Sequence, residues 1–358
     1  MKKIVINLAT ILLFLICLLF AKPSFAQEAI IEVIKYNDSI FENYTVNSPQ
    51  EAKNSIDENY VTWIDVRNSS QKNIMSEFVS IFNLPEKVST ETIDLEAIPK
   101  IDELEDDLFL IVKTVESENI INQIHLEHIG IIWSNNYVIT FNESNNDNFA
   151  YVKELIKKET SRNLWSNYQL ETGYLIYNLM DTVVDNYFSA LDVITRQLDQ
   201  IEKEIFTSQE ADILKEIYNI KREITKGKRA IWPMRNTIGY LVNYDYPQIS
   251  SDLKQDFRGI YDNLNTLVEI SEILSSNNTE IVNFYISVRS DHTNDILRFL
   301  TIISTILFVL SFIAAVYGLN FSQFHPTEKR KRGHSLVIVA MIIMALALIA
   351  FFWVINWI

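Results

Sequence analysis

One side of the segment 294–315, near the C-terminus, carries mainly small and hydroxylated residues at helical spacing. Positions three and four residues apart share one face of an α-helix. That face carries Asn294, Leu297, Thr301, Ser304, Phe308, Ser311 and Ala315, with Leu300 beside them. Such a stripe would line a narrow pore, with wettable hydroxyl bands and apolar constrictions that close by dewetting. The same residues would also allow close helix packing in lipid, and periodicity alone favours that packing.

The segment ends in Tyr317-Gly318-Leu319-Asn320, which brings an uncharged amide oxygen to the end of the helix. Amide oxygens accept hydrogen bonds from water, and Mg²⁺ releases its water ligands reluctantly. A ring of Asn320 side chains would therefore select hydrated Mg²⁺ through its water ligands without stripping them. Gly318 permits a close turn here. We expect Gly318, Leu319 and Asn320 to form the selective end of a pore.

Two uncharged stretches, 299–324 and 335–358, are each long enough to cross a bilayer as a helix. They predict a first, pore-lining transmembrane helix over 297–320 and a second one over 335–358. The loop between them, 321–334, is basic because it contains Lys329-Arg330-Lys331-Arg332.

Long helical patterns precede the membrane segment over 161–296, which we expect to form a helical and stalk region. They cover 161–206 and 211–244, Pro247 then breaks the pattern, and a third stretch runs from about Ser250 to Asn320 without proline. At 1.5 Å per residue the third helix would be about 100 Å long. An amphipathic helix of that length has to bury its apolar stripe against copies of itself, so we expect a homo-oligomer.

Residues 27–160 alternate short β-rich runs with helical patches and predict a mixed α/β soluble domain. The predicted strands are Ile30–Ile34, Val61–Ile64, Leu108–Val112, Ile129–Trp133 and Tyr137–Phe141. The predicted helices are 70–82 and 86–96, and Asn135-Asn136 indicates a hairpin turn because Asn tolerates positive φ. The chain as a whole is predicted to be an α+β membrane protein.

Residues 1–26 have the layout of a secretory signal peptide. Lys2 and Lys3 precede an apolar run over 4–21, and Ser24-Phe25-Ala26 offers small residues for cleavage. The apolar run is long enough that an uncleaved N-terminal anchor remains an alternative.

Composition excludes several classes of protein. The net charge of −15 would repel nucleic-acid phosphates. The single cysteine, Cys17, lies in the leader, so the rest of the chain has no disulfide and no thiolate metal site. Catalytic triads, phosphate-binding glycine loops and zinc spacings are absent from the sequence, so we expect no enzyme activity and no resident cofactor.

Several further stretches occur in the order found in one known family. They are Trp63 to Val66, Pro99 to Asp102, Leu108 to Lys113, Asn136 to Phe141, Tyr174 to Asp181, Lys228 to Arg235 and Phe257 to Asp262. Together with Tyr317-Gly318-Leu319-Asn320, which stands where that family has Tyr-Gly-Met-Asn, they resemble the CorA family of divalent-cation channels, whose signature is Gly-x-Asn. The resemblance covers roughly residues 60 to 322.

The resemblance implies a homopentamer in the plasma (inner) membrane, crossing it more than once and in contact with membrane lipid. Its substrates would be divalent metal cations, most readily Mg²⁺, with Co²⁺ and Ni²⁺ as further candidates. It places the stripe from Asn294 to Ser311 on the pore, makes Tyr317 part of the signature, and lets Asn320 meet the metal through hydrating water. It also makes Glu91 a candidate metal ligand between neighbouring soluble domains.

The chain departs from the family pattern at several points. Leu319 replaces a methionine, and the family carboxylate that would accompany Glu91 is Gly259 here. A second family carboxylate, on the stalk nearer the membrane, is Asn283 here. The loop after the signature carries four consecutive basic residues from Lys329, where the family has an acidic stretch. Two alternatives therefore remain open: a zinc-exporting relative, for which His325 is the suggestive residue, and a non-conducting cation sensor or membrane-anchored protein.

The membrane orientation is open as well. In the family both termini face the cytoplasm. A cleaved signal would instead export the acidic domain, and the basic loop would then mark the cytoplasmic side. We expect an inverted orientation with an extracytoplasmic soluble domain, the alternative being the family orientation with an additional N-terminal extension.

Overall fold

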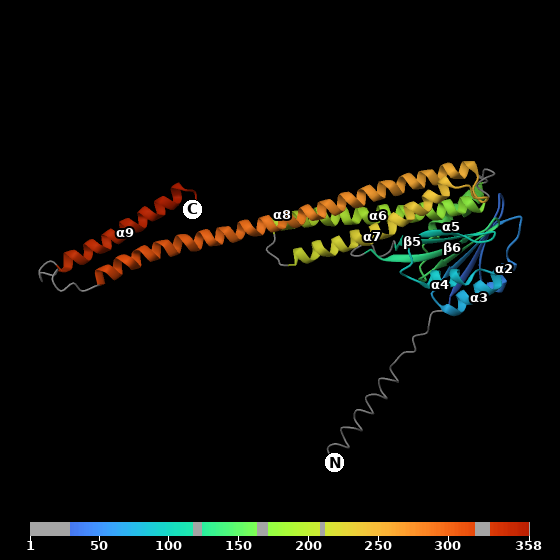
Figure 1. Ribbon diagram of the computed structural model, residues 1–358, viewed down its shortest axis with the longest axis horizontal. Coiled ribbons are helices and arrows are strands. Elements are labelled where there is room, and N and C mark those ends of the chain that lie inside the picture. Colours follow the sequence, from blue (N-terminus) through green and yellow to red (C-terminus); the bar gives the residue numbers. More distant parts are fainter. Residues whose placement is uncertain (1–28, 117–123, 163–170, 208–211, 319–329, 358) are drawn as a thin grey trace, which may run out of the picture. The chain divides into compact units, whose positions relative to one another are not determined.

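The computed structural model describes residues 29–116, 124–162, 171–207, 212–318 and 330–357 (Figure 1). The predicted leader, Leu319, Asn320, His325 and Lys329 lie outside these residues. The chain divides into two compact units. The first combines the residues before Leu198 with Asn219–Ser276, and the second combines Leu198–Tyr218 with the residues from Asn277 onward.

A seven-stranded mixed sheet forms the centre of the first unit. Its strands are β1 (Ile30–Tyr36), β2 (Phe41–Val46), β3 (Val61–Arg67), β4 (Lys100–Glu103), β5 (Leu108–Val115), β6 (Leu126–Trp133) and β7 (Tyr137–Asn142). Their order is β2-β1-β3-β7-β6-β5-β4. The β3 and β7 strands pair in parallel, and the other neighbours pair antiparallel. The central strands are buried on both faces, so both faces must be covered.

Helices cover both faces of this sheet (Figure 1). On one face lie α2 (Pro49–Asn54), α3 (Lys72–Phe82) and α4 (Glu86–Ile93), and Phe78 of α3 packs edge-on against Phe141 at 5.2 Å between ring centroids. The other face meets α5 (Ala150–Arg162) and α6 (Thr172–Thr207). There the Trp133 indole N–H donates to Thr172 Oγ1 at 3.1 Å.

Three long helices complete the described chain after α6. They are α7 (Ile213–Asn243), α8 (Ser251–Gly318) and α9 (Arg330–Val354). Within the first unit, the buried sides of α6, α7 and α8 carry apolar residues at helical spacing, such as Leu179, Ile231 and Leu264. The predicted third helix is confirmed, since α8 continues for 68 residues without a break.

The predicted α+β class is confirmed, and each predicted strand and helix of the soluble domain is present. The elements β2, β4, α2 and α5 were not predicted. The hairpin at Asn135-Asn136 is present, with Ser134 N–H donating to Tyr137 O at 3.0 Å. Its predicted reason is wrong, because the described non-glycine residues with positive φ are Asn68, Asn83 and Asn356.

The structure also differs from the predicted helix boundaries. Of the helix expected over 161–206, residues 161–162 end α5 and residues 172–206 belong to α6, while residues 163–170 lie outside the described residues. The expected loop over 321–334 gives way to helix at Arg330, so three of the four basic residues belong to the start of α9. That helix ends at Val354 rather than at residue 358.

Candidate pore segment and charged sites

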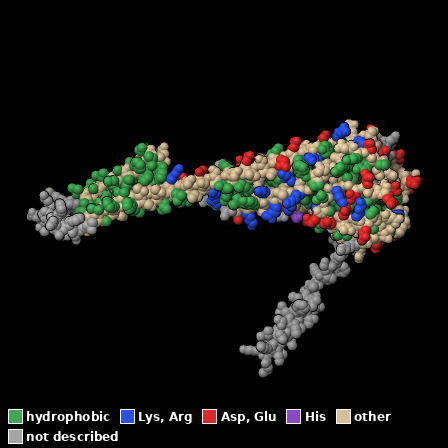
Figure 2. Space-filling view, viewed as in Figure 1, with side chains coloured by type: hydrophobic (Ala, Val, Ile, Leu, Met, Phe, Trp, Pro, Cys, Tyr) green, Lys and Arg blue, Asp and Glu red, His purple; other side chains and the backbone are tan. Residues whose placement is uncertain are grey.

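The described chain contains two helices that are long and apolar enough to cross a membrane. One is α8, through its C-terminal part, and the other is Ser335–Val354 within α9. Almost none of the side chains in these apolar segments is buried, and Figure 2 shows green side chains on the surface of the second unit. Such surfaces need lipid or further protein to cover them.

The predicted pore stripe lies on the exposed surface of α8. Each of its described members is exposed: Asn294, Leu297, Leu300, Thr301, Ser304, Phe308, Ser311 and Ala315. In contrast Ile302 is buried in the second unit, as is Phe352 of α9. At 100° per residue, Ile302 is at least about 100° away from the stripe residues nearest to it. The stripe and the covered side of α8 are therefore different faces of the helix.

Two hydroxyl groups on the stripe donate hydrogen bonds to backbone carbonyls of α8. Thr301 Oγ1 donates to Leu297 O, and Ser304 Oγ donates to Leu300 O, each at 2.7 Å. With its proton committed in this way, each hydroxyl oxygen keeps lone pairs that can accept hydrogen bonds. The stripe can therefore accept hydrogen bonds from the water molecules around a cation.

The end of α8 is described only as far as Gly318. Tyr317 is 39% exposed, and a methyl group added at Gly318 would meet no atom within 4 Å. Gly318 is the last described residue of α8, and the close turn expected here involves the residues that follow it, so it stays a prediction. Leu319 and Asn320 lie outside the described residues, and their roles stay predictions.

Glu91 forms an ion pair in its own chain. Lys100 Nζ lies 2.8 Å from its carboxylate and 2.9 Å from that of Asp102. Burial alone would lower the pKa of Lys100, but hydrogen bonds to Glu91 and Asp102 raise it above its ordinary value. Gly259 is exposed on α8 with open space around it. The charge on Glu91 is therefore balanced by an ammonium group before any metal binds.

A second charged cluster is buried at the sheet. Lys153 of α5 lies 2.6 Å from Glu32, 2.8 Å from Asp65 and 3.0 Å from Asp147. Asp65 also accepts hydrogen bonds from Thr140 and Asn142. The ammonium group occupies the position between carboxylates that a cation would take, so this cluster joins α5 to the sheet and offers no open metal site.

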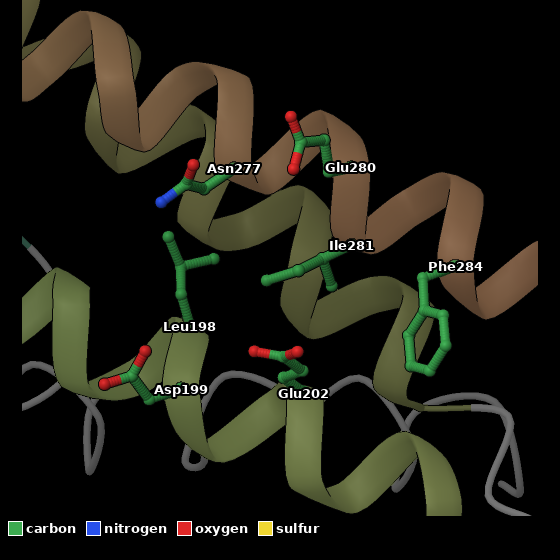
Figure 3. A pocket seen from close by; sticks show the side chains of 7 residues that line it. All are labelled: Leu198, Asp199, Glu202, Asn277, Glu280, Ile281 and Phe284. Carbon is green, nitrogen blue, oxygen red and sulfur yellow. The ribbon is translucent and has the colours of Figure 1, made fainter.

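An acidic pocket lies between α6 and α8 in the second unit (Figure 3). It has a volume of about 340 Å³ and is lined by Leu198, Asp199, Glu202, Asn277, Glu280, Ile281 and Phe284. Glu280 points away from α6 in Figure 3, and the described residues contain no group of three His, Cys, Asp or Glu side chains placed to hold a metal. The three-residue spacing of Asp199 and Glu202 was the sequence signal that could have indicated the pocket.

Comparisons with known proteins agree with this architecture. The family model for the CorA-like Mg²⁺ transporter protein matches residues 58–355. The cobalt/magnesium transport protein CorA of Thermotoga maritima is 26% identical over 327 residues, covering 91% of this chain and 92% of that protein. The putative metal ion transporter YfjQ of Bacillus subtilis is 27% identical over 254 residues, covering 71% and 76%.

Solved structures share the fold. The complete CorA magnesium transporter from Methanocaldococcus jannaschii superposes with a TM-score of 0.76 at 19% identity, covering 93% of this chain and 99% of that one. The family match spans strands β3 to β7 of the sheet, the long α8 and α9. The chain therefore belongs to the family of CorA-like Mg²⁺ transporter proteins.

Proposed function

We propose that this protein is a channel for divalent metal cations, with Mg²⁺ as its principal substrate and Co²⁺ as a second one. The observation that carries the proposal is α8, a single helix whose exposed stripe presents hydroxyl oxygens along an apolar, membrane-length segment. Relatives described as cobalt/magnesium transport proteins support the choice of ions.

The pore in this proposal is formed by α8 helices from several copies, and we infer a homopentamer. Asn294 lies toward the soluble end of the stripe, and Asn320 follows its other end. Between them the oxygens of Thr301, Ser304 and Ser311 contact the water shell of the ion, and Leu297, Leu300 and Phe308 form apolar constrictions. Mg²⁺ keeps several water ligands in such a path, because it dehydrates reluctantly.

The experiment is divalent-metal flux into proteoliposomes that contain the purified protein. Mg²⁺ entry should be abolished by Asn320→Ala and retained in Ser335→Ala, a control at the start of the second apolar segment. Oligomers that pass no divalent ion would favour the non-conducting alternative. Zinc flux without Mg²⁺ flux would favour the zinc-exporting alternative.

We further propose the inverted orientation, with the soluble domain outside the cytoplasm. Three basic residues in the first turn of α9, together with Lys329, mark that end of the hairpin as cytoplasmic. Entry of a divalent ion would still be driven by a negative interior, by about 4.6 kcal/mol per 100 mV for two charges. Protease added to spheroplasts should degrade the soluble domain, whereas full protection would contradict the inversion.

We retain Glu91 as a candidate metal ligand, with the difference that a metal there must displace Lys100. If Glu91 binds metal, Lys100→Met should strengthen divalent-ion binding measured by calorimetry, and Glu91→Gln should remove it in that background. Identical binding in both variants would exclude Glu91.

A further inference from the structure

The pore stripe of α8 continues beyond the apolar segment, within the second unit. Counting back from Asn294 in steps of four and three residues reaches Ser290, Ser287, Asn283 and Glu280, and all five side chains are exposed. The same alternation of threes and fours defines the pore stripe, so these residues share its face of the helix. We call the four residues from Glu280 to Ser290 the stripe extension. From Glu280 to Asn294 it measures about 21 Å along the helix axis.

The opposite side of α8 is covered within the same unit. Ile281 is 8% exposed and Asn278 is 1% exposed. At 100° per residue, each of them lies about 140–160° around the helix from Asn283. In Figure 3, Ile281 lies between α8 and α6, whereas Glu280 points away from α6. The stripe extension is therefore the side of α8 that its own unit leaves uncovered.

The side chains of the stripe extension are all polar. The hydroxyl oxygens of Ser287 and Ser290 and the amide oxygen of Asn283 can accept hydrogen bonds from water. Mg²⁺ releases its water ligands reluctantly, so a row of acceptors lets the ion advance with its water shell in place. The stripe extension therefore offers a hydrated cation the same kind of contact as Thr301 and Ser304 within the apolar segment.

A single charge stands at the far end of this row. Glu280 is the one charged residue on the stripe between residues 280 and 315, all of which the structure describes. Its carboxylate forms no ion pair with any described residue. Asp295 and Arg298, nearer the apolar segment, pair with each other at 3.4 Å. The stripe thus ends on the soluble side in an exposed carboxylate whose charge no described side chain balances.

We propose that the cation path continues along α8 from Asn294 to Glu280, and that Glu280 draws cations to its soluble end. In a homo-oligomer each copy contributes one such carboxylate, and a ring of like charges concentrates cations at a pore mouth and repels anions. The attraction acts about twice as strongly on a divalent ion as on a monovalent one. This inference rests on the proposed function, because it extends the pore described there.

Cross-linking of the full-length protein tests whether the stripe extension faces the other copies, and it needs no flux. In a Cys17→Ser background, Ser290→Cys should be cross-linked between copies by the short thiol reagent bismaleimidoethane. His292→Cys is the matched control, since His292 is also exposed but lies about 160° around the helix from Ser290. Absence of the cross-link at Ser290→Cys, or an equal yield at His292→Cys, would overturn the proposed path.

The ionic-strength dependence of flux tests the role of Glu280. Glu280→Gln should lower the initial rate of Mg²⁺ uptake into proteoliposomes roughly fivefold at about 10 mM ionic strength and less than about twofold at about 1 M, because salt screens the attraction. Glu280→Asp should keep most of the rate, since the charge remains. Glu216→Gln should leave the rate unchanged, because Glu216 is an exposed carboxylate of the same unit on another helix.

The outcomes separate this inference from the channel function. Equal rates in Glu280→Gln and the wild type at low ionic strength would overturn the role of Glu280 and leave the channel standing. An equal loss in Glu280→Gln and Glu216→Gln would overturn it as well, since the effect would then follow from overall charge. Wild-type protein that passes no Mg²⁺ would contradict the channel function, and the role of Glu280 with it.

Discussion

Thr301 gives the most direct residue-level test of the pore. Its hydroxyl group donates to Leu297 O, so its oxygen is left to accept hydrogen bonds from water at the stripe. Thr301→Val keeps the shape and removes this acceptor, and we expect Mg²⁺ flux to fall roughly tenfold. Thr301→Ser should keep the flux within about twofold, since the hydroxyl remains. Initial uptake rates in proteoliposomes measure both, and equal rates in the two variants would remove Thr301 from the path.

His128 should make the soluble domain sensitive to acid. Burial, and then the nearby charge of Lys113, lower the pKa of His128 from its ordinary value of 6.5 to about 4. The unfolded state therefore binds more protons between these two values. The contribution of His128 to stability is complete above pH 6.5 and is lost as the pH falls toward 4, by up to about 3 kcal/mol.

Thermal unfolding between pH 4 and pH 7 checks this prediction. The melting temperature of the wild type should fall more steeply with decreasing pH than that of His128→Leu. Taking the difference between the two proteins cancels the opposite contribution of Glu127, whose burial raises its pKa. Parallel curves would mean that His128 does not titrate in this range.

At the scale of elements, Lys153 decides how firmly α5 is attached to the sheet. Lys153→Met would leave the buried carboxylates of Glu32 and Asp65 without their ammonium partner, which we expect to destabilise the unit by about 3–5 kcal/mol. Lys157→Met is the control on the same helix, because its pair with Glu154 is exposed. Trp63, whose ring lies 5.5 Å from Lys153 Nζ, gives a local fluorescence signal for unfolding. Equal melting temperatures in the two variants would contradict the prediction.

Two helical glycines should respond in opposite directions to alanine. A Cβ at Gly173 in the first turn of α6 would lie 2.2 Å from Leu253 Cδ2 and 3.3 Å from Gln248 O, so Gly173→Ala should destabilise by about 1–3 kcal/mol. A Cβ at Gly259 would meet nothing within 4 Å, so Gly259→Ala should stabilise by about 0.5–1 kcal/mol. Unfolding in denaturant measures both changes. If both substitutions raised the free energy of unfolding, a methyl group at Gly173 would not clash with Leu253 and Gln248.

The elements that could be predicted from the sequence are those with a strong pattern. Strands such as β5 and β6 are runs of buried β-branched and aromatic residues, and α8 has no breaker over its whole length. The edge strands β2 and β4 are short, contain no buried residue and are rich in polar residues, so tertiary pairing decides their conformation.

The candidate site was predictable where spacing within one helix decides it. The face shared by Asn294, Thr301 and Ser304 follows from helical periodicity, and these residues are exposed in the structure. The pairing of Glu91 with Lys100 was not predictable, because it depends on how α4 approaches the edge of the sheet. Nor was the joining of Lys153 to Glu32, which lie far apart in the chain.

At the scale of the whole molecule, α8 is one unbroken helix. The number of residues that precede the stripe therefore sets the direction in which the stripe faces. Each residue turns a helix by 100°, so one alanine inserted after Ser276 would swing the stripe by about 100°, whereas seven inserted residues would stop about 20° short of two full turns. We expect the single insertion to abolish Mg²⁺ flux and the seven-residue insertion to restore part of it, and undiminished flux after the single insertion would contradict this. The stalk should therefore tolerate many substitutions but few insertions or deletions.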